Sequence, residues 1–368
     1  MVSFKSAKMK NVLQIMPEFG LAGAETMCET LCYKLHDSGK YNVIVASLFD
    51  FHSPITERLE EKGIKVMYLN KKSGMDVSVI RKLYSVMKTQ HIDIVHTHRY
   101  VMQYAIPAAV MAGVKVRVHT VHNIATKEVD SYRRKLAHFF YKYCNVTPVS
   151  ISPLIQNTVV KEYHITKSLI PVIFNGSDLS KCIVKSGYKA STPFQIVHIG
   201  RFNPQKNHDA IIKTAKILKG EGYKFVIKLI GGAGDEEQRK KEVKEEGLEN
   251  QIEFCGLQSN VYPFLHDADC FVLPSLYEGM PVTLVEAMGT GLPIIASSVG
   301  GVPDMIVDGK TGLLIEPNAT ELVVAIKRLM EDETLRKKIG ENALRKSKDF
   351  SAERMFEGYD NLYMKLWQ

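Results

Sequence analysis

The chain has 368 residues, of which 45% are hydrophobic and 24% are charged. This length exceeds the size at which a single hydrophobic core stops growing, so two globular domains are expected. No apolar run reaches the roughly eighteen residues of a membrane-spanning helix, and the first ten residues lack the apolar stretch of a signal peptide. The six cysteines form no CxxC pair, which indicates reduced thiols and a cytoplasmic protein.

The net charge of +8 is concentrated in the first half. Residues 1–180 hold 23 lysines and arginines against 14 acids, a balance of +9, whereas residues 181–368 hold 25 against 26, a balance of −1. A basic half favours an acidic surface or ligand, such as anionic lipid, lipid phosphate or nucleic acid. Solubility alone explains the same balance.

Strand-like and helix-like segments alternate along the whole chain. In the first half, β-branched runs predict strands at 12–16, 42–48, 65–69, 93–97 and 116–121. Apolar residues three and four apart predict helices at 23–38, 76–90 and 99–112. A second series of strands is predicted at 194–200, 224–232, 251–256, 269–275, 292–297 and 311–316. This alternation predicts βαβ units and parallel sheets covered by helices on both faces.

The boundary between the domains is expected near 175–193, where a turn signal precedes a polar, weakly periodic segment. We therefore assign a first domain to residues 1–178 and a second to residues 179–350. Residues 351–368 have a helical pattern and are expected to pack back on the first domain.

Both domains carry glycines where a strand passes into a helix, at the sheet edge where open parallel sheets bind ligands. In the first domain this turn is PEFGLAGAE at 17–25. Gly20 and Gly23 would let a ligand approach the backbone, and the start of the next helix would favour an anion. A simple tight connection explains the glycines equally well.

The turn of the second domain is GRFNPQKN at 200–207. Arg201 and Lys206 place two cations at the ligand-binding edge, where they would bind phosphate oxygens. A solvated basic loop is the alternative.

A second loop of this domain is EGMPVTLVE at 278–286. Pro281 suits the first turn of a helix whose free amides, near Gly279, would point at a ligand. Glu278 and Glu286 are good acceptors from hydroxyl groups. Cations on one loop and carboxylates on another predict a ligand with a charged middle and hydroxylated ends, such as a nucleotide-sugar.

These motifs resemble those of the retaining GT-B glycosyltransferases of the glycogen-synthase-like family 4, or group 1, including bacterial capsule and exopolysaccharide enzymes. The second half carries GRFNPQKN, LPSLYEGMP with its E-x7-E spacing, and SSVGGVPDMIVDGKTGLL in the family's order over most of 196–315. The first half agrees more loosely, through GAE, DIVHTH, VHN and FNGSD. The resemblance implies an α/β fold of two Rossmann-like parallel-sheet domains facing across a cleft, with the donor held mainly by the second.

The resemblance also implies residue roles. Arg201 and Lys206 would bind the donor diphosphate, Glu286 the ribose hydroxyls and Glu278 hydroxyls of the transferred sugar. The predicted donor-binding residues are Gly23, Arg201, Lys206, Glu278, Gly279, Met280, Pro281 and Glu286. The predicted catalytic residues are His122, Glu278, Arg201 and Lys206.

His122 matches the family's histidine that faces the sugar. On the residues alone, a buried, hydrogen-bonded core histidine explains it equally well. Gly20, His98 and Asn123 are assigned to the acceptor side. Because His96 and His98 alternate along a strand end, one of them is expected to face inward.

The sequence departs from the family pattern in two places. Ala22 replaces a common glycine, so backbone contacts at that position are not carried over. Met280 and Pro281 replace a common Phe-Gly pair, a variant that keeps the donor site and can change the choice of sugar. Asp267 and Asp269 have the spacing of a metal-binding pair, but caps and turns explain them better. The resemblance implies no metal and no cofactor.

The predicted function is metal-independent transfer, with retention of configuration, of a sugar from a nucleotide donor to an acceptor hydroxyl. UDP is the expected nucleotide on family frequency alone. The alternatives are an epimerase or phosphorylase on the same fold, or a non-catalytic binder of nucleotide-sugars or nucleic acid. Nucleic acid is not expected as a partner, because the basic half lacks interleaved aromatic and basic recognition motifs.

The acceptor is predicted to be a lipid-linked glycan, or a soluble one, in surface polysaccharide biosynthesis. One basic segment also carries aromatic residues: Tyr132, Arg133, Arg134, Lys135, Phe139, Phe140 and Tyr141. Docking of this segment on anionic lipid would place the cytoplasmic protein at the inner membrane face. A solvated helix over its own core explains the segment nearly as well.

Overall fold

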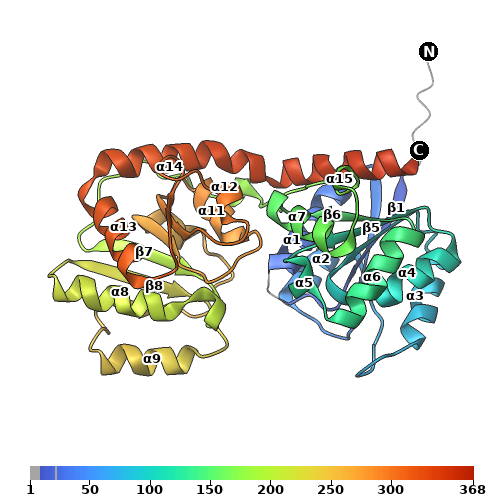
Figure 1. Cartoon of the computed structure of the whole chain (residues 1–368), viewed down its shortest axis with the longest axis horizontal. Helices are drawn as coiled ribbons and strands as arrows, with labels where there is room; N and C mark the ends of the chain where they lie inside the picture. The colour runs from blue at the N-terminus through green and yellow to red at the C-terminus, as the bar shows by residue number, and fades with distance from the viewer. Residues whose placement is uncertain (1–8, 21–22) are drawn as a thin grey trace, which may run out of the picture. The chain divides into compact units, whose positions relative to one another are not determined.

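The computed structural model describes residues 9–20 and 23–368, which belong to two compact units (Figure 1). Unit 1 consists of residues 1–176 and 352–368, and unit 2 consists of residues 177–351. The chain leaves unit 1 two residues before the expected boundary and returns to it one residue after the expected position.

The described part of unit 1 contains a six-stranded parallel sheet in the order β3-β2-β1-β4-β5-β6. Its strands are β1 (Lys10–Met16), β2 (Tyr41–Ser47), β3 (Lys65–Tyr68), β4 (Ile94–His98), β5 (Val116–Val121) and β6 (Val146–Ser150). Strands β2 and β3 follow β1 on one side of the sheet, and β4, β5 and β6 follow it on the other. The carboxyl ends of β1 and β4 therefore flank the switch point, where open α/β sheets bind ligands.

Strand β6 is absent from the sequence-based prediction. Pro148 interrupts its β-branched pattern, and a proline inside a strand pattern argues against a strand. In the structure β6 lies at the edge of the sheet and pairs only with β5. An edge strand tolerates a residue without a backbone N–H group, because one of its sides has no neighbour to pair with.

Helices cover both faces of this sheet. They are α1 (Gly23–Asp37), α2 (Pro54–Glu61), α3 (Ser78–Thr89), α4 (Met102–Ala112), α5 (Ala125–Glu128), α6 (Ser131–Tyr143), α7 (Pro153–Tyr163) and α15 (Ala352–Trp367), with 3-10 turns η1 (Arg99–Val101) and η2 (Lys167–Leu169). Alternate residues of β1 enter different cores: Val12 packs with α1 and α15, whereas Leu13 and Ile15 pack with α3 and α4. This alternation follows from the two-residue period of a strand.

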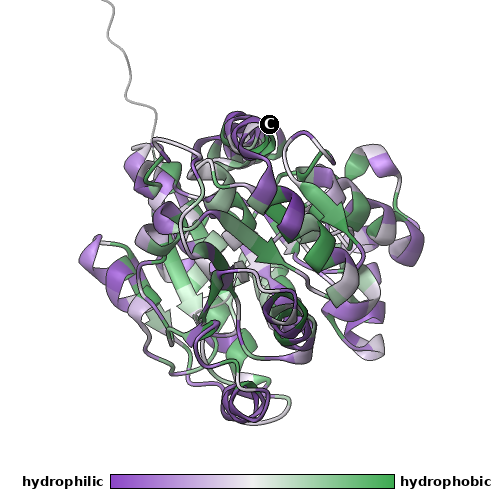
Figure 2. Cartoon of the chain, turned by 90° about the vertical axis from the view of Figure 1, so that its left-hand side faces the viewer, coloured by the Kyte–Doolittle hydropathy of each residue, from purple (hydrophilic) through white to green (hydrophobic). Residues whose placement is uncertain are grey.

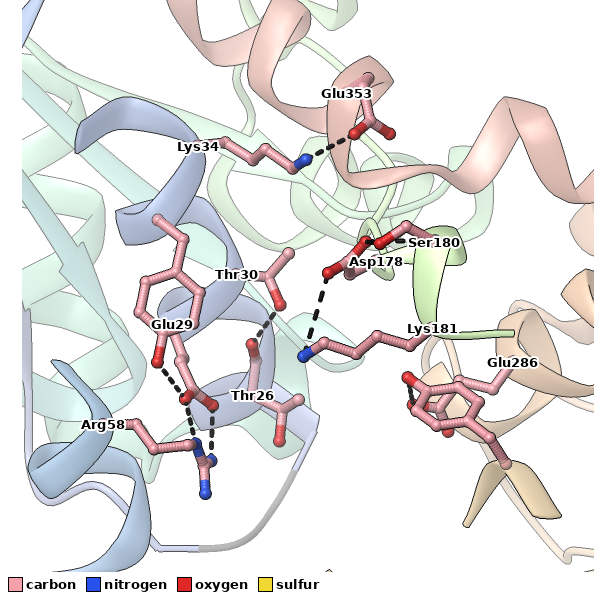
Figure 3. Close-up of polar contacts among 12 residues, drawn as sticks. Thr26, Glu29, Thr30, Lys34, Arg58, Asp178, Ser180, Lys181, Glu286 and Glu353 are labelled. Carbon is pink, nitrogen blue, oxygen red and sulfur yellow. Dashed lines mark hydrogen bonds and ion pairs between the residues drawn. The ribbon is translucent and has the colours of Figure 1, made fainter. Parts of the chain in front are cut away.

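Helix α15 completes the core of unit 1 although it ends the chain. Its side chains Met355, Tyr359 and Tyr363 are at most 2% exposed and join the core beneath α1. Lys34 of α1 donates to Glu353 at 2.5 Å (Figure 3). The helix is therefore held to unit 1 by buried apolar area, with surface ion pairs at its rim.

Unit 2 is described over its whole length and contains a second six-stranded parallel sheet, in the order β12-β11-β10-β7-β8-β9. Its strands are β7 (Phe194–Ile199), β8 (Phe225–Ile230), β9 (Ile252–Phe254), β10 (Cys270–Leu273), β11 (Ile294–Ser297) and β12 (Leu313–Ile315). The order reverses between β7 and β10, so their carboxyl ends flank the switch point of this sheet.

The helices of unit 2 are α8 (His208–Gly220), α9 (Glu236–Glu245), α10 (Tyr262–Asp267), α11 (Val282–Gly289), α12 (Val302–Met305), α13 (Ala319–Glu331) and α14 (Glu333–Ser347), with 3-10 turns η3 (Leu179–Lys181), η4 (Pro204–Lys206) and η5 (Lys348–Phe350). Figure 2 shows hydrophobic strands between helices that turn hydrophilic sides outward. Within residues 9–20 and 23–368, no helix is both long enough and apolar enough to cross a membrane.

The packing of α15 leads to a stability prediction. Met355→Ala should lower the free energy of unfolding by about 2–5 kcal/mol, because it leaves a cavity in the core of unit 1. Met364 lies on the same helix and is 41% exposed. Met364→Ala should change that free energy by less than about 0.5 kcal/mol. Urea unfolding followed by circular dichroism measures both, and equal effects would contradict the packing of α15 described above.

Candidate functional site

The loops that follow β7 and β10 are joined by hydrogen bonds at the switch point of unit 2. Leu276 N donates to Gln205 O at 2.8 Å, and Gln205 Nε2 donates to Tyr277 O at 2.9 Å. Asn207 Nδ2 donates to Pro274 O at 3.0 Å. The two sequence motifs GRFNPQKN and EGMPVTLVE are therefore parts of one surface.

Lys206 and Glu278 form an ion pair at the centre of this surface. The Lys206 Nζ atom lies 2.7 Å from Glu278 Oε1, and the two side chains are only 15% and 6% exposed. Asn203 Oδ1 accepts from Lys206 N at 3.2 Å and fixes the turn η4. A Cβ atom at Gly200 would lie 3.0 Å from the Lys206 side chain, so this glycine makes room for it. A cation and a carboxylate thus stand side by side, largely out of water.

The backbone of Glu278 is supported by the glycines after β11. Gly300 has φ +57°, and a Cβ atom there would lie 1.6 Å from Glu278 O. Gly301 N donates to the same oxygen at 3.2 Å. Gly300 of the SSVGG stretch is therefore needed to let two loops approach each other, which gives that motif a structural role.

Glu286 lies in α11, and its carboxyl accepts from the Tyr262 hydroxyl at 3.3 Å (Figure 3). Burial raises the pKa of Glu286 to about 7. Helix α11 begins at Val282, so Pro281 precedes the first turn and does not lie within it as predicted. The Thr283 hydroxyl is buried at this helix start and has no partner among the described residues.

The remaining predicted residues of unit 2 differ in exposure. Arg201 is exposed, Gly279 is half-buried, and Met280 and Pro281 are buried. Asp269 accepts from Gln195 N at 2.8 Å and from Ser191 N at 3.2 Å, which ties the start of β7 and the segment before it to the residue that precedes β10. No group of three His, Cys, Asp or Glu residues within the described ranges is placed to hold a metal ion.

In unit 1 the predicted residues follow β1, β4 and β5. A Cβ atom at Gly20 or Gly23 would meet nothing within 4 Å, so neither glycine is needed for packing in the described structure. Ala22 lies outside the described residues. Glu25 is 2% exposed and accepts from Arg99 Nη1 at 2.5 Å. Arg99 has φ +57°, a left-handed conformation that is uncommon for a residue with a side chain.

His98 and His122 are in direct contact. His98 Nδ1 lies 3.0 Å from His122 Nε2, and His98 itself is fully buried. The expectation that only one of His96 and His98 faces inward is wrong. Residues two apart share a face of a strand, and both rings are buried, 4.3 Å apart between centroids. Asn123 Oδ1 accepts from Ile124 N at 2.8 Å and shapes the turn after His122.

Three polar residues near these sites were not singled out from the sequence. Glu128 accepts from the backbone amides of His122 and Asn123, and burial raises its pKa to about 7. Tyr262 contacts Glu286. Gln14 accepts from His98 Nε2 at 2.9 Å. Gln14 had a visible signal, because it is the one polar residue in the strand VLQIM, whereas the other two lie in ordinary polar segments.

Comparison with known proteins identifies the family. The family model described as glycosyl transferases group 1 matches residues 183–346, and the model described as glycosyltransferase family 4 matches residues 21–181. The chain is 30% identical over 281 residues to the UDP-Gal:alpha-D-GlcNAc-diphosphoundecaprenol alpha-1,3-galactosyltransferase of Escherichia coli, covering 71% of this chain and 72% of that one. It is 29% identical over 309 residues to the N-acetyl-alpha-D-glucosaminyl L-malate synthase of Bacillus anthracis, covering 78% of each.

Solved structures agree on the fold. HepE of Anabaena, determined in complex with UDP, superimposes with a TM-score of 0.82 at 20% identity, covering 97% of this chain and 100% of that one. A glycosyltransferase of Rickettsia africae superimposes with a TM-score of 0.84 at 19% identity, covering 98% and 100%. The two parallel sheets are those of the GT-B fold, as predicted. This chain therefore belongs to the family 4, group 1 glycosyltransferases.

Proposed function

We propose that this glycosyltransferase transfers a sugar from a UDP-sugar to a glycan hydroxyl in surface polysaccharide biosynthesis, with retention of configuration and without a metal ion. The observation that carries the donor half of this proposal is the Lys206–Glu278 pair at the switch point of unit 2, beside the start of α11. The names of the Escherichia coli relative and of the HepE complex, which contain a UDP-sugar and UDP, support the choice of nucleotide.

Each part of the donor finds a chemically suitable partner in unit 2. Lys206, Arg201 and the free amides at the start of α11 suit the diphosphate, because helix N-termini favour anions. Glu286 suits the ribose diol, whose two hydroxyl groups donate hydrogen bonds. Glu278, beside Lys206, suits hydroxyls of the sugar that is attached to the diphosphate. His122 takes the role of the family's histidine that contacts this sugar.

In the proposed reaction, the acceptor oxygen bonds to the anomeric carbon from the face that the diphosphate leaves. The bond between that carbon and the phosphate oxygen breaks, and the leaving phosphate takes the acceptor's proton. Lys206 and Arg201 stabilise the negative charge that develops on the diphosphate, which is electrostatic catalysis. Metal independence is part of the proposal. It is supported by Asp269, whose carboxylate is occupied by backbone amides.

Lys206→Met and Glu278→Gln should each lower the transfer rate at least about tenfold, or roughly 1.4 kcal/mol. Each single variant should also be less stable, because it leaves a charge largely buried without its partner. The double variant should regain stability but not activity. UDP release from a panel of UDP-sugars and thermal unfolding measure the two effects, with exposed Lys213→Met as the control. Wild-type transfer by the double variant would contradict the proposal.

The raised pKa of Glu286 predicts a pH-dependent affinity for UDP. With a pKa of about 7, the carboxyl is mostly protonated at pH 6 and ionised at pH 8. Only the ionised form accepts from both ribose hydroxyls, so the dissociation constant should fall by up to about tenfold over this range. In the absence of nucleotide, a rise in pH has the opposite effect on folding stability. A carboxyl whose pKa is raised by folding stabilises the folded protein less as the pH rises.

Calorimetric titration with UDP at several pH values measures this dependence. The terminal phosphate of UDP also titrates, with a pKa of about 6 like that of other phosphate monoesters, and this titration adds its own pH dependence to binding. Glu286→Gln provides the control, because it keeps the titration of the nucleotide and removes that of the protein. If the dissociation constant of UDP has the same pH dependence in Glu286→Gln and wild type, the assignment of Glu286 to the ribose is wrong.

The acceptor side of the proposal includes docking on an anionic membrane through α6. Tyr132, Phe139 and Tyr143 are 58%, 50% and 63% exposed, and Lys135 and Lys142 are exposed on the same helix. Such a mixed aromatic and basic face suits a lipid surface that carries a lipid-linked acceptor.

Not all residues that were predicted for this face are exposed on it. Phe140, which was predicted to belong to it, is buried, and Tyr141 is half-buried. Arg133 pairs with Asp130, and Arg134 pairs with Glu162 at 2.9 Å. The two lysines, and not the arginine pair, are therefore the cations that we expect to meet lipid.

Lys135→Glu combined with Lys142→Glu should weaken binding to anionic vesicles at least about tenfold, because each basic residue near such a surface contributes about 1 kcal/mol. Arg81→Glu with Lys88→Glu on α3 applies the same charge change at exposed positions of unit 1 and should have a smaller effect. Flotation with phosphatidylglycerol and phosphatidylcholine vesicles measures both. Absence of salt-sensitive binding by the wild type would remove the membrane from the proposal.

A further inference from the structure

A chain of hydrogen bonds runs through the core of unit 1 from α15 to His122. His122 Nε2 lies 3.0 Å from His98 Nδ1, and His98 Nε2 lies 2.9 Å from Gln14 Oε1. Gln14 Nε2 in turn donates to the Tyr363 hydroxyl at 3.4 Å. Gln14, His98 and Tyr363 are fully buried. These hydrogen bonds therefore link α15 to a residue at the sheet edge.

The chemistry of these groups fixes the direction of each hydrogen bond. The amide oxygen of Gln14 can only accept, so the hydrogen of His98 lies on Nε2. Burial holds the pKa of His98 well below its usual value, so this ring is neutral and its Nδ1 has no hydrogen. The hydrogen between the two histidines must then belong to His122 Nε2.

This direction determines what His122 offers to a ligand. Burial lowers the pKa of His122 to about 3, so its ring is neutral and carries one hydrogen. That hydrogen is engaged with His98, which leaves Nδ1 with a free lone pair. Nδ1 is buried and has no hydrogen-bond partner among the described residues. A buried acceptor without a partner is rare in native structures, and a role in binding or catalysis is one explanation of it.

We propose that Gln14 and Tyr363 are positioning residues that act through His98 to hold His122 in the tautomer with a free Nδ1. In that tautomer His122 accepts a hydrogen bond from a substrate hydroxyl. This inference rests on the proposed function, which assigns the contact with the sugar to His122. It adds that the C-terminal helix α15 contributes to the site without touching the substrate.

Helix α15 supplies a matched control for this proposal. Tyr359 lies one turn before Tyr363, is equally buried, and donates to or accepts from Thr120 Oγ1 at 2.7 Å. Thr120 Oγ1 lies 2.7 Å from His96 Nε2, and His96 Nδ1 lies 2.7 Å from the Tyr363 hydroxyl, so in the described structure Tyr359 reaches the bonds of Gln14 only through His96. Tyr359→Phe therefore removes a buried hydroxyl from the same helix and leaves the bonds from Gln14 to His122 intact.

The first experiment compares the kinetics of Tyr363→Phe, Tyr359→Phe and Gln14→Leu, measured as UDP release from the UDP-sugar that the full chain turns over. Tyr363→Phe should lower kcat about three- to tenfold and Gln14→Leu at least about tenfold, with KM within about twofold, since misorientation affects the reacting complex more than binding. Gln14→Glu keeps the acceptor for His98 and should retain more activity than Gln14→Leu. Equal losses in Tyr359→Phe and Tyr363→Phe, or an unchanged kcat in Gln14→Leu, overturn the proposal.

The second experiment reads the tautomer directly and needs no activity. Nitrogen NMR of protein labelled with 15N-histidine distinguishes protonated from unprotonated ring nitrogens, and His122→Asn identifies the signals of His122. Wild type should show hydrogen on Nε2 of His122, and Gln14→Leu should lose this preference. Hydrogen on Nδ1 in the wild type overturns the proposal. Wild-type activity of His122→Asn would instead refute the proposed function of His122 and leave the tautomer result standing.

Discussion

A lysine and a carboxylate that share a largely buried position constrain the loops at the ligand-binding edge of unit 2. The Lys206–Glu278 pair is stable out of water only while its partners stay within hydrogen-bond distance, because a buried charge without a partner is costly. Several features keep the Lys206 and Glu278 side chains close together. They are the missing side chain at Gly200, the turn capped by Asn203, and the left-handed Gly300 against the Glu278 backbone. A ligand with a diphosphate next to a hydroxylated ring can engage both members of this pair.

The candidate ligand-binding residues lie at the switch point of the sheet in both units, but their side chains differ in charge. Each sheet reverses its strand order once, and the predicted residues gather at that reversal. In unit 2 the gathered groups are charged and suit a nucleotide. In unit 1 they include the fully buried His98 and its partner His122, which are neutral and adjoin Gln14; such groups suit the orientation of hydroxyl groups. The basic surface of unit 1 lies elsewhere, on helices such as α6.

Much of this architecture was predictable from the sequence because local patterns determine it. Alternating β-branched runs and helical periodicities predict eleven of the strands and the helix at 351–368, and the position of the domain boundary follows from turn residues. The exception, β6, failed because Pro148 contradicts a strand unless its edge position is known. The order of strands, and hence the switch points, depends on long-range pairing that no local pattern reveals.

The site shows the same division. Arg201, Lys206 and Glu278 could be proposed from the sequence because they stand in recognisable loops, and Glu286 because of its E-x7-E spacing from Glu278. The direct pairing of Lys206 with Glu278, the contact of Tyr262 with Glu286 and the bond between His98 and His122 join residues 24 to 72 positions apart. Such contacts depend on packing. The inward direction of His96 and His98 was misjudged because the two-residue period of a strand was misapplied.

The central claim is that unit 2 holds the nucleotide between the loops after β7 and β10. Hydrogen–deuterium exchange of the full chain, with and without saturating UDP, tests it most directly. We predict slower exchange in peptides that cover residues 200–207 and 278–286, with a smaller change in α9 and α13, which lie outside these two loops. Saturated binding of UDP with no protection at either loop would contradict the account.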